Sequence, residues 1–495
     1  MYPSMEAVQK LAATGDYGRI PVSRELYADR FTPIEVMRTL RAASRHCYLL
    51  ESAESRETWG RYSFLGYAPT LELTCKDGCL KLTYDPESEN PRVETRQVEH
   101  PGEAIRGVLS AQKSPKLEGL PPFTGGFVGY FSYDYLQYAE PSLRRGGDQA
   151  GDFRDVDLML FDRVIVFDNY RQKLILIAGV DARNPENSYR AAEQALREME
   201  ELLVSGAKAV FRPLRLKSPL ELCFSKEAYM GMVERARHYI HEGDIFQVVL
   251  SNPMEAQAEG SLFDVYRVLR TTNPSPYMFY FSSDDIEVSG ASPETLAKLQ
   301  DGVLHTFPLA GTRPRGKTPE EDQALERELL ADEKERAEHN MLVDLGRNDL
   351  GKLSKLGTVR VEKYMTIERY SHVMHIGSTV SGEIRTDRDA VDAVDAILPA
   401  GTLSGAPKLR AMEIIQELEG RPRGIYGGAI GYLDFTGNLD VCISIRLAYK
   451  KNGKVCVQSG AGIVYDSEPE KEYFECRNKA RAVVAAIEAA EGGLR

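Results

Sequence analysis

Two pairs of glutamates with the same spacing are the residues in this sequence best suited to holding a metal ion. Glu335 and Glu338 lie three residues apart on an otherwise apolar face of a helix expected over 319–349, and Glu472 and Glu475 repeat that spacing in a second expected helix. A buried carboxylate is costly unless it is paired or bound to a cation. Carboxylate oxygens are the ligands that Mg²⁺ prefers, so the four acids indicate a magnesium site if the fold brings the two helices together.

Each glutamate pair also has an ordinary interpretation. In the first helix both acids would be solvated and would pair with Lys334 or His339. The second helix is preceded by Ser467 and has Glu470 three residues later, which is the spacing of a capping box with Ser467 as the cap. Neither pair alone decides between a surface and a site, but the occurrence of two pairs favours the metal site.

Two glycine-rich segments are suited to binding a carboxylate. The segment 401–408 precedes a helix expected over 409–418, and the segment 460–462 follows a strand expected over 454–459. Turns of this kind present backbone N–H groups to an anion. The first segment does not have the spacing of a phosphate-binding P-loop, and the alternative for both is tight turn geometry alone.

A histidine and an arginine complete the set of candidates. His375 alternates with Val373 along a strand-like run, although a lone histidine is more often a hydrogen-bonded structural residue than a catalyst. Arg446 ends an otherwise apolar expected strand, and a buried arginine requires an anionic partner, either a protein carboxylate or a substrate. These residues indicate an α/β enzyme that uses Mg²⁺ and a small carboxylated substrate, without defining its reaction.

The elements that must position these residues are short strands mixed with helices. Strands are expected over 71–74, 164–168, 173–178 and 246–251, and further helices over 33–44, 188–205 and 226–242. A chain of 495 residues is long enough for two domains. The basic, proline-containing stretch 211–219 is interpreted as the joint between residues 1–215 and 216–495.

Composition excludes several classes of protein. A net charge of −12 disfavours binding to nucleic acid or to an anionic membrane. No apolar run approaches the ~20 residues of a membrane span and no signal peptide is visible, so a cytoplasmic location is expected. The seven cysteines are dispersed and only Cys75 and Cys79 are close, which predicts reduced thiols and neither disulfides nor a zinc site.

Several longer motifs resemble the chorismate-utilising enzymes. They occupy residues 308–316, 332–349, 398–408 and 458–467, within a resemblance that runs from about Ser225 to Ala486. The N-terminal segments 49–52 and 60–66 resemble the large subunit of anthranilate synthases. The resemblance implies an α+β fold of packed antiparallel β-sheets surrounded by helices, in two interlocked domains. The first, 1–215, would be regulatory and the second, 216–495, would bind chorismate.

The resemblance also implies a role for each candidate residue. The Mg²⁺ ligands would be Glu338 and Glu475, with Glu335 and Glu472 close by. The ring carboxylate of chorismate would be held by Gly460, Ala461, Gly462 and Lys479, and the enolpyruvyl carboxylate by Tyr426 and Arg446. The departing C4 hydroxyl would be protonated by Glu294, and the residues near the ring would be Thr312 and His375.

Two positions distinguish this sequence from its relatives. Aminodeoxychorismate synthases have a lysine nucleophile where this sequence has Ala310, and isochorismate and salicylate synthases use a lysine to activate water where it has Gln247. The resemblance therefore implies attack by ammonia, and formation of anthranilate and pyruvate. The ammonia would come from solution or from a separate glutamine amidotransferase subunit, since no glutaminase segment is present. The alternatives are a synthase that releases aminodeoxyisochorismate and a non-catalytic protein that senses tryptophan.

Regulation by L-tryptophan is implied by two further segments. Glu51 with Ser52, and the run 273–279, resemble the two halves of the tryptophan feedback site. The expected contacts in and around these segments are Glu51, Ser52, Pro274, Pro276, Tyr277 and Met278. The alternative for the second segment is an ordinary turn followed by a core methionine.

Overall fold

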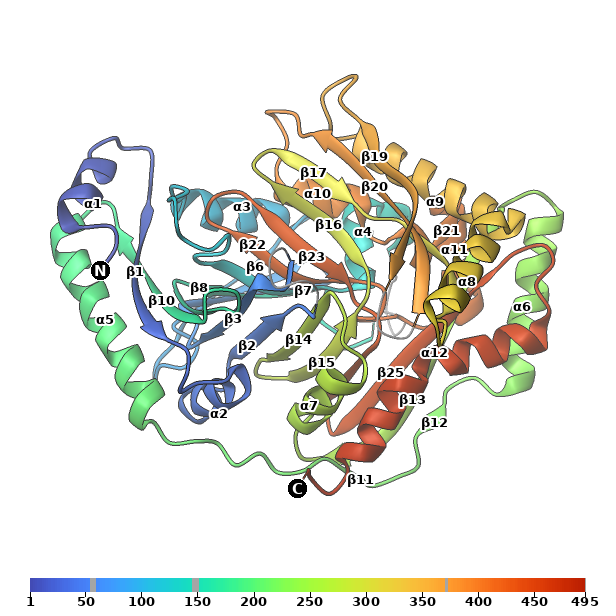
Figure 1. The fold of residues 1–495 in the computed structure, drawn as a ribbon, viewed down its shortest axis with the longest axis horizontal. Helices are drawn as coiled ribbons and strands as arrows, with labels where there is room; N and C mark the ends of the chain where they lie inside the picture. Colours follow the sequence, from blue (N-terminus) through green and yellow to red (C-terminus); the bar gives the residue numbers. More distant parts are fainter. Residues whose placement is uncertain (54–58, 145–150, 370–372, 495) are drawn as a thin grey trace.

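Two antiparallel β-sheets form the centre of the molecule, as seen in a computed structural model that describes residues 1–53, 59–144, 151–369 and 373–494 (Figure 1). The first sheet has 13 strands, in the order β1 (Arg19–Tyr27), β10 (Lys173–Asp181), β9 (Arg163–Asp168), β3 (Tyr62–Tyr67), β2 (Cys47–Glu51), β14 (Tyr277–Ser282), β15 (Ile286–Ser292), β24 (Leu447–Lys451), β25 (Lys454–Ile463), β13 (Gln247–Glu259) and β11 (Arg215–Leu216), with β12 (Glu221–Leu222) and β21 (Gly405–Ala406) also paired to β13.

The second sheet has 12 strands. Their order is β18 (Leu309–Pro314), β20 (Val373–Glu383), β17 (Val303–Thr306), β16 (Thr295–Gln300), β23 (Leu439–Ile443), β22 (Ala429–Asp434), β7 (Gly126–Phe131), β8 (Val156–Phe161), β4 (Leu71–Lys76), β5 (Cys79–Tyr84) and β6 (Arg92–Gln97), with β19 (Arg360–Arg369) paired to β20. The α-helices are α1 (Met5–Ala12), α2 (Pro33–Ala43), α3 (Gly102–Ala111), α4 (Leu136–Ala139), α5 (Pro185–Ser205), α6 (Lys226–His241), α7 (Phe263–Thr272), α8 (Pro319–Ala331), α9 (Glu333–Gly351), α10 (Ala390–Ile397), α11 (Lys408–Glu419) and α12 (Pro469–Ala490).

Alternating side chains on the strands build the core. On β14, Phe279 and Phe281 enter an aromatic cluster shared with strands of the second sheet, whereas Met278 and Tyr280 face the core under the helices. A strand that is buried on both faces has apolar side chains at successive positions, which explains the nearly continuous apolar sequence of Tyr277–Ser282. The predicted α+β arrangement of packed antiparallel sheets with surrounding helices is confirmed.

Strands from both ends of the sequence share each sheet. In the first sheet β2 pairs with β14, and in the second β7 pairs with β22. The proposed joint near residue 215 falls in β11, on a connection that runs along the outside of the molecule between α5 and α6 (Figure 1). The division into domains 1–215 and 216–495 stays a prediction.

Four local predictions are wrong in detail. The helix expected over 319–349 is two helices, because Asp332 caps α9 by accepting hydrogen bonds from the backbone N–H groups of Lys334 and Glu335. Ser467 does not cap α12: the cap is Glu468, and the Ser467 hydroxyl accepts from the Val464 N–H instead. The remaining two corrections concern the 460–462 segment and Arg446 and are described with the site.

All seven cysteines are free thiols, and Cys79 and Cys223 are exposed. Within the described residues, no helix combines the length and apolar character required to cross a bilayer. The run containing His375 begins at Ser371, which lies outside the described residues.

Candidate active site

The first glutamate pair lies in the first turns of α9 and the second in the first turns of α12. Burial raises the pKa of Glu338, and the carboxylates of Glu335 and Glu475 raise it further, although Lys479 opposes them. Burial likewise raises the pKa of Glu472, and the neighbouring Glu475 adds to this. The two helices therefore face each other closely enough for their acids to repel one another, which is the condition that a divalent cation relieves.

The side chains fit a magnesium ion in type and charge. The Oε2 atom of Glu472 is buried without a hydrogen-bond partner in the described chain. Two of the acids are engaged with cations: Glu335 lies 3.4 Å from Arg313, and Glu475 lies 2.8 Å from Lys479. Among the described residues, no three of the four acids bring their ligand atoms within 4.8 Å of one another. The orphaned Glu472 oxygen and the half-buried Glu338 are the observations that fit a metal ion.

The 460–462 segment belongs to β25, so the prediction that it is a turn after the strand is wrong. Its glycines are required by close neighbours, since a Cβ on Gly460 would lie 2.9 Å from the Tyr426 hydroxyl and one on Gly462 would lie 2.7 Å from Nε2 of Gln247. Both neighbours are buried. The glycines thus leave space beside a hydroxyl and an amide that can donate to a carboxylate, while Ala461 packs in the core beneath α6 and α11.

Arg446 does not end a strand: it lies in the connection between β23 and β24, with a left-handed φ of 53°. Its side chain is half-buried, and burial lowers the pKa of its guanidinium. In the part of the chain that is described, no carboxylate lies within ion-pair distance of it. The positive charge of Arg446 acts on Tyr426 and on His375, so its guanidinium lies near both side chains. A half-buried arginine without a protein anion is suited to binding an anionic ligand.

His375 lies opposite an irregularity in the pairing of β18 with β20. Gly311 and Thr312 fall between the paired residues Ala310 and Arg313, and His375 is the single residue across from them. The Nδ1 of His375 lies 2.8 Å from the Gly311 carbonyl and 3.1 Å from the Thr312 hydroxyl. A carbonyl only accepts, so Nδ1 carries the proton and Nε2 has the lone pair. Burial lowers the pKa of His375, which keeps the ring neutral near pH 7.

Glu294 follows β15 and lines a small cavity of about 40 Å³ between β16 and α9. Burial raises the pKa of Glu294 to about 7, although a hydrogen bond from Thr402 and the charge of Lys479 oppose this. The Thr402 hydroxyl donates to Oε1 of Glu294 at 3.0 Å. A carboxyl group with this pKa is protonated in about half of the molecules at pH 7, so it can act as a proton donor there.

Three supporting contacts were not predicted from the sequence. Thr402 was inside the segment 401–408, but its bond to Glu294 depends on the fold. In the same segment, Lys408 donates to Asp349 of α9 at 2.7 Å and to the Ile397 carbonyl. Arg423 and Glu419 form a fully buried pair at 2.6 Å, and Arg423 also donates to the carbonyls of Leu403 and Val249. These contacts fix segment 401–408 against α9 and β13.

A second cavity, of about 330 Å³, lies between the two sheets. It is lined by most of the predicted tryptophan contacts, namely Glu51, Ser52, Pro276, Tyr277 and Met278, whereas Pro274 is not among its lining residues. The carboxylate of Glu51 is occupied by protein donors, since Tyr266 donates at 2.6 Å and Arg270 at 2.8 Å. At the far wall, the Tyr277 hydroxyl donates to Asp440 at 2.8 Å.

The sheet pair and the acid-lined site define a class of enzyme. Residues 45–485 match the family model of the chorismate binding enzymes, and this chain belongs to that family. It is 46% identical over 498 residues to anthranilate synthase component 1 of Acetivibrio thermocellus, with 99% of each chain covered.

Solved structures agree with this assignment. Anthranilate synthase component I from Streptococcus pneumoniae superimposes with a TM-score of 0.74 at 40% identity, covering 86% of this chain and 92% of the other. The menaquinone-specific isochorismate synthase from Escherichia coli superimposes with a TM-score of 0.69 at 19% identity, covering 98% of each chain, and shows the shared fold alone.

Proposed function

We propose that this chain is component 1 of an anthranilate synthase, which converts chorismate and ammonia to anthranilate and pyruvate in the first step of tryptophan biosynthesis. The observation that carries the proposal is the pairing of two features in one site: Arg446, which is half-buried with no carboxylate of the described residues at ion-pair distance, and Glu294, a carboxyl group whose pKa burial raises to about 7. The chain is 45–46% identical, along nearly its full length, to two anthranilate synthase component 1 proteins, and this supports the formation of anthranilate.

The two carboxylates of chorismate would be bound by two neighbouring sets of residues. Tyr426 and Arg446 hold the enolpyruvyl carboxylate, because Arg446 supplies a charge and Tyr426 a buried hydroxyl beside it. Gly460, Gly462 and the backbone of Ala461 receive the ring carboxylate, with Lys479 as its cation. Glu338 and Glu475 would bind Mg²⁺, with Glu335 and Glu472 nearby, and the ion when bound would withdraw electron density through that carboxylate.

The protein's own groups account for the proton transfers. Ammonia forms a bond to C2 as the C4–oxygen bond breaks, and Glu294 gives its proton to the departing hydroxyl, which leaves as water. Removal of the C2 proton then breaks the bond to the enolpyruvyl oxygen, so pyruvate leaves and the ring becomes aromatic. His375 presents the lone pair of Nε2 for this step, while Gly311 and Thr312 hold its Nδ1.

Two side chains favour ammonia over other nucleophiles. Ala310 is buried on β18 and has no group that can attack the ring. Gln247 is not a base, so it cannot activate water, although its amide lies beside Gly462. The ammonia would be supplied from solution or by a separate glutamine amidotransferase subunit, consistent with a protein whose relatives are called component 1. A cytoplasmic location is proposed with the biosynthetic role.

Feedback inhibition by L-tryptophan is assigned to the cavity of about 330 Å³. Aromatic side chains line it together with Asp440 and Lys298, which lie 3.8 Å apart, so it offers apolar walls and both signs of charge to an aromatic amino acid. Tyr277 connects the cavity to the catalytic region, since its hydroxyl accepts a bond from Thr295 at 3.0 Å. Thr295 follows Glu294 directly, which gives a bound ligand a route to the proposed acid.

We expect Ser52→Phe to abolish most of the inhibition while sparing catalysis. The phenyl ring would enter the cavity from β2 and take the volume that an indole requires, so the tryptophan concentration for half-inhibition should rise at least about tenfold, about 1.4 kcal/mol of binding free energy. Ser52→Ala is the matched variant and should have a smaller effect. Unchanged inhibition in Ser52→Phe would place the tryptophan site elsewhere.

The test of the reaction is anthranilate fluorescence from the purified chain with chorismate, Mg²⁺ and a concentrated ammonium salt at mildly alkaline pH. Emission that is lost on adding EDTA and restored by Mg²⁺ is the expected result. Consumption of chorismate without emission would identify a synthase that releases aminodeoxyisochorismate. Chorismate left intact even with a glutaminase partner present would contradict the proposal and indicate a non-catalytic tryptophan-binding protein.

A further inference from the structure

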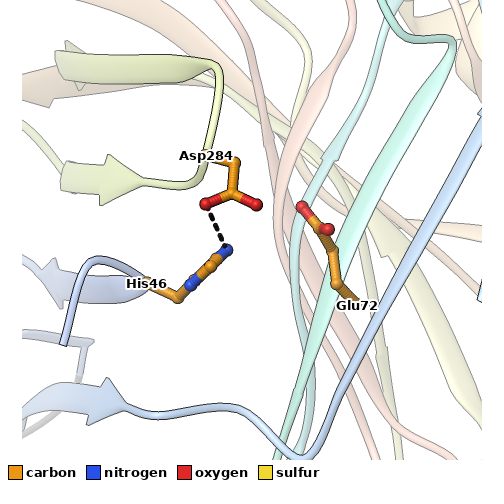
Figure 2. Close-up of side chains that lie close together, drawn as sticks. All are labelled: His46, Glu72 and Asp284. Carbon is orange, nitrogen blue, oxygen red and sulfur yellow. Dashed lines mark ion pairs between the residues drawn. The ribbon is translucent and has the colours of Figure 1, made fainter. Parts of the chain in front are cut away.

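A second cluster of potential metal ligands lies between the two sheets, away from the glutamates of α9 and α12. It consists of His46 just before β2, Glu72 on β4 and Asp284 in the turn between β14 and β15. One ligand atom of each lies within 4.8 Å of the others. Figure 2 shows the His46 ring pointing toward the space between the two carboxylates, which come from different sheets.

His46 is oriented as a metal ligand rather than as a surface ion pair. Its side chain is 0% exposed, and its Nε2 has no hydrogen-bond partner in the described chain, although Asp284 lies 3.4 Å away. Its Nδ1 lies 2.8 Å from Oε1 of Glu87. The same oxygen accepts hydrogen bonds from the Ser44 hydroxyl and from the backbone N–H groups of Arg45 and His46. An oxygen that accepts these bonds also accepts from Nδ1 of His46, so Nδ1 is the donor and Nε2 points into the cluster.

A carboxylate behind the far nitrogen of a histidine is the usual support of a metal-binding imidazole, because it fixes the ring and raises its basicity. Glu87 has this position here. A second buried oxygen, Oδ1 of Asp157 on β8, also lacks a hydrogen-bond partner beside Glu72 and Arg154. Two unsatisfied buried atoms in one cluster are costly unless a ligand meets them.

Carboxylates outnumber the permanently charged cations in the ion-pair network that includes His46. The five carboxylates are Glu72, Glu87, Asp157, Asp284 and Asp285, and the three cations are Arg45, Arg154 and Lys451. With a neutral imidazole and every carboxylate ionised the excess is two negative charges, but burial raises the pKa of Asp157 to about 7, so the excess at neutral pH is smaller. The site also has an entrance, because the Asp284 side chain is 42% exposed.

We propose that His46, Glu72 and Asp284 form a binding site for a divalent cation of the Mn²⁺ type, which joins the two sheets. One imidazole and two carboxylates suit a borderline or hard first-row ion, and the absence of a thiolate disfavours the softest ones. The site lies at the opposite end of β2 and β14 from Ser52 and Tyr277, which line the cavity of about 330 Å³. A cation here would fix the two strands that carry the lining residues.

A proton is the competing occupant of Nε2. Burial lowers the pKa of His46, and Glu87, Asp284 and Glu72 together raise it by more. A protonated histidine paired with Asp284 would account for the cluster without a metal ion. The experiment must therefore detect the cation itself.

Mn²⁺ is the probe, because the exposed thiols of Cys79 and Cys223 would compete for Zn²⁺. The full chain carrying Glu338→Gln and Glu475→Gln is freed of metal with EDTA, exchanged into buffer and titrated while electron paramagnetic resonance follows free Mn²⁺. We expect one Mn²⁺ bound per chain. Adding Asp284→Asn should weaken its affinity at least about tenfold, since a charged ligand is lost.

The matched control is Asp301→Asn, because Asp301 also lies in a hairpin turn, between β16 and β17, and its carboxylate forms an ion pair with exposed Lys116. It should leave Mn²⁺ affinity unchanged. Saturating Mn²⁺ should also raise the melting temperature by about 2–4 °C in the parent and not in Asp284→Asn. Absence of stoichiometric binding, or equal affinity in the Asp284→Asn and Asp301→Asn variants, would overturn the proposal. Neither result depends on chorismate turnover.

Discussion

Replacing Glu338 by glutamine is expected to lower Mg²⁺-supported anthranilate formation by about 10³-fold. Stabilisation of developing charge by a metal ion is worth several kcal/mol, and each 1.36 kcal/mol of barrier is a factor of ten in rate. Glutamine keeps the size of the side chain but removes the charge that a magnesium ligand requires. The loss should appear in steady-state fluorescence assays with ammonia, and excess Mg²⁺ should restore little of it.

The same variant should fold at least as stably as the parent. Because burial and neighbouring acids raise the folded-state pKa of Glu338, its ionised form destabilises the fold at neutral pH, and an uncharged glutamine removes that cost. Glu333→Gln, in the exposed first turn of the same helix, is the control and should keep activity within about twofold of the parent. A Glu338→Gln enzyme with full activity, or one whose activity loss follows a fall in melting temperature, would contradict the assigned role.

Much of the fold could be predicted because local patterns were strong. The apolar stripes of α5 and α6 and the short β-branched runs of β9 and β10 predict these elements to within about three residues at each end. The break at Asp332 was missed because both halves continue a helical pattern, and only the capping bonds of Asp332 separate them. Which strands share a sheet was not accessible from local patterns, since β2 pairs with β14, which lies nearly half the chain away in the sequence.

The candidate site was predicted by residue type and not by geometry. Paired glutamates and an arginine in an apolar run were visible as anomalies, and the resemblance to chorismate-utilising enzymes supplied their roles. The glycines of β25 were interpreted as turn residues, because nothing local shows that Tyr426 and Gln247 approach them. His46 was overlooked for the same reason: its ligand partners Glu72 and Asp284 are distant in sequence and lie on different sheets.

A second large effect, on kcat/KM and its pH dependence, is expected from replacing Glu294. Its pKa of about 7 arises mainly from burial, so the carboxyl group holds its proton below that pH and loses it above. If it acts as the general acid, kcat/KM for chorismate should fall as pH rises above about 7, because only the protonated form can donate. Glu294→Gln should lower kcat/KM by about 10²–10⁴ and remove this alkaline limb, since an amide does not replace the acid.

Ammonia complicates the measurement, because its reactive base form increases with pH while protonated Glu294 decreases. Total ammonium should therefore be adjusted at each pH to keep free NH₃ constant. The Thr402→Val variant tests the direction of the pKa shift. The hydrogen bond from Thr402 lowers the pKa of Glu294, so its loss should move the alkaline limb to higher pH. An alkaline limb that survives in Glu294→Gln, or that stays in place in Thr402→Val, would assign the proton donor to another group.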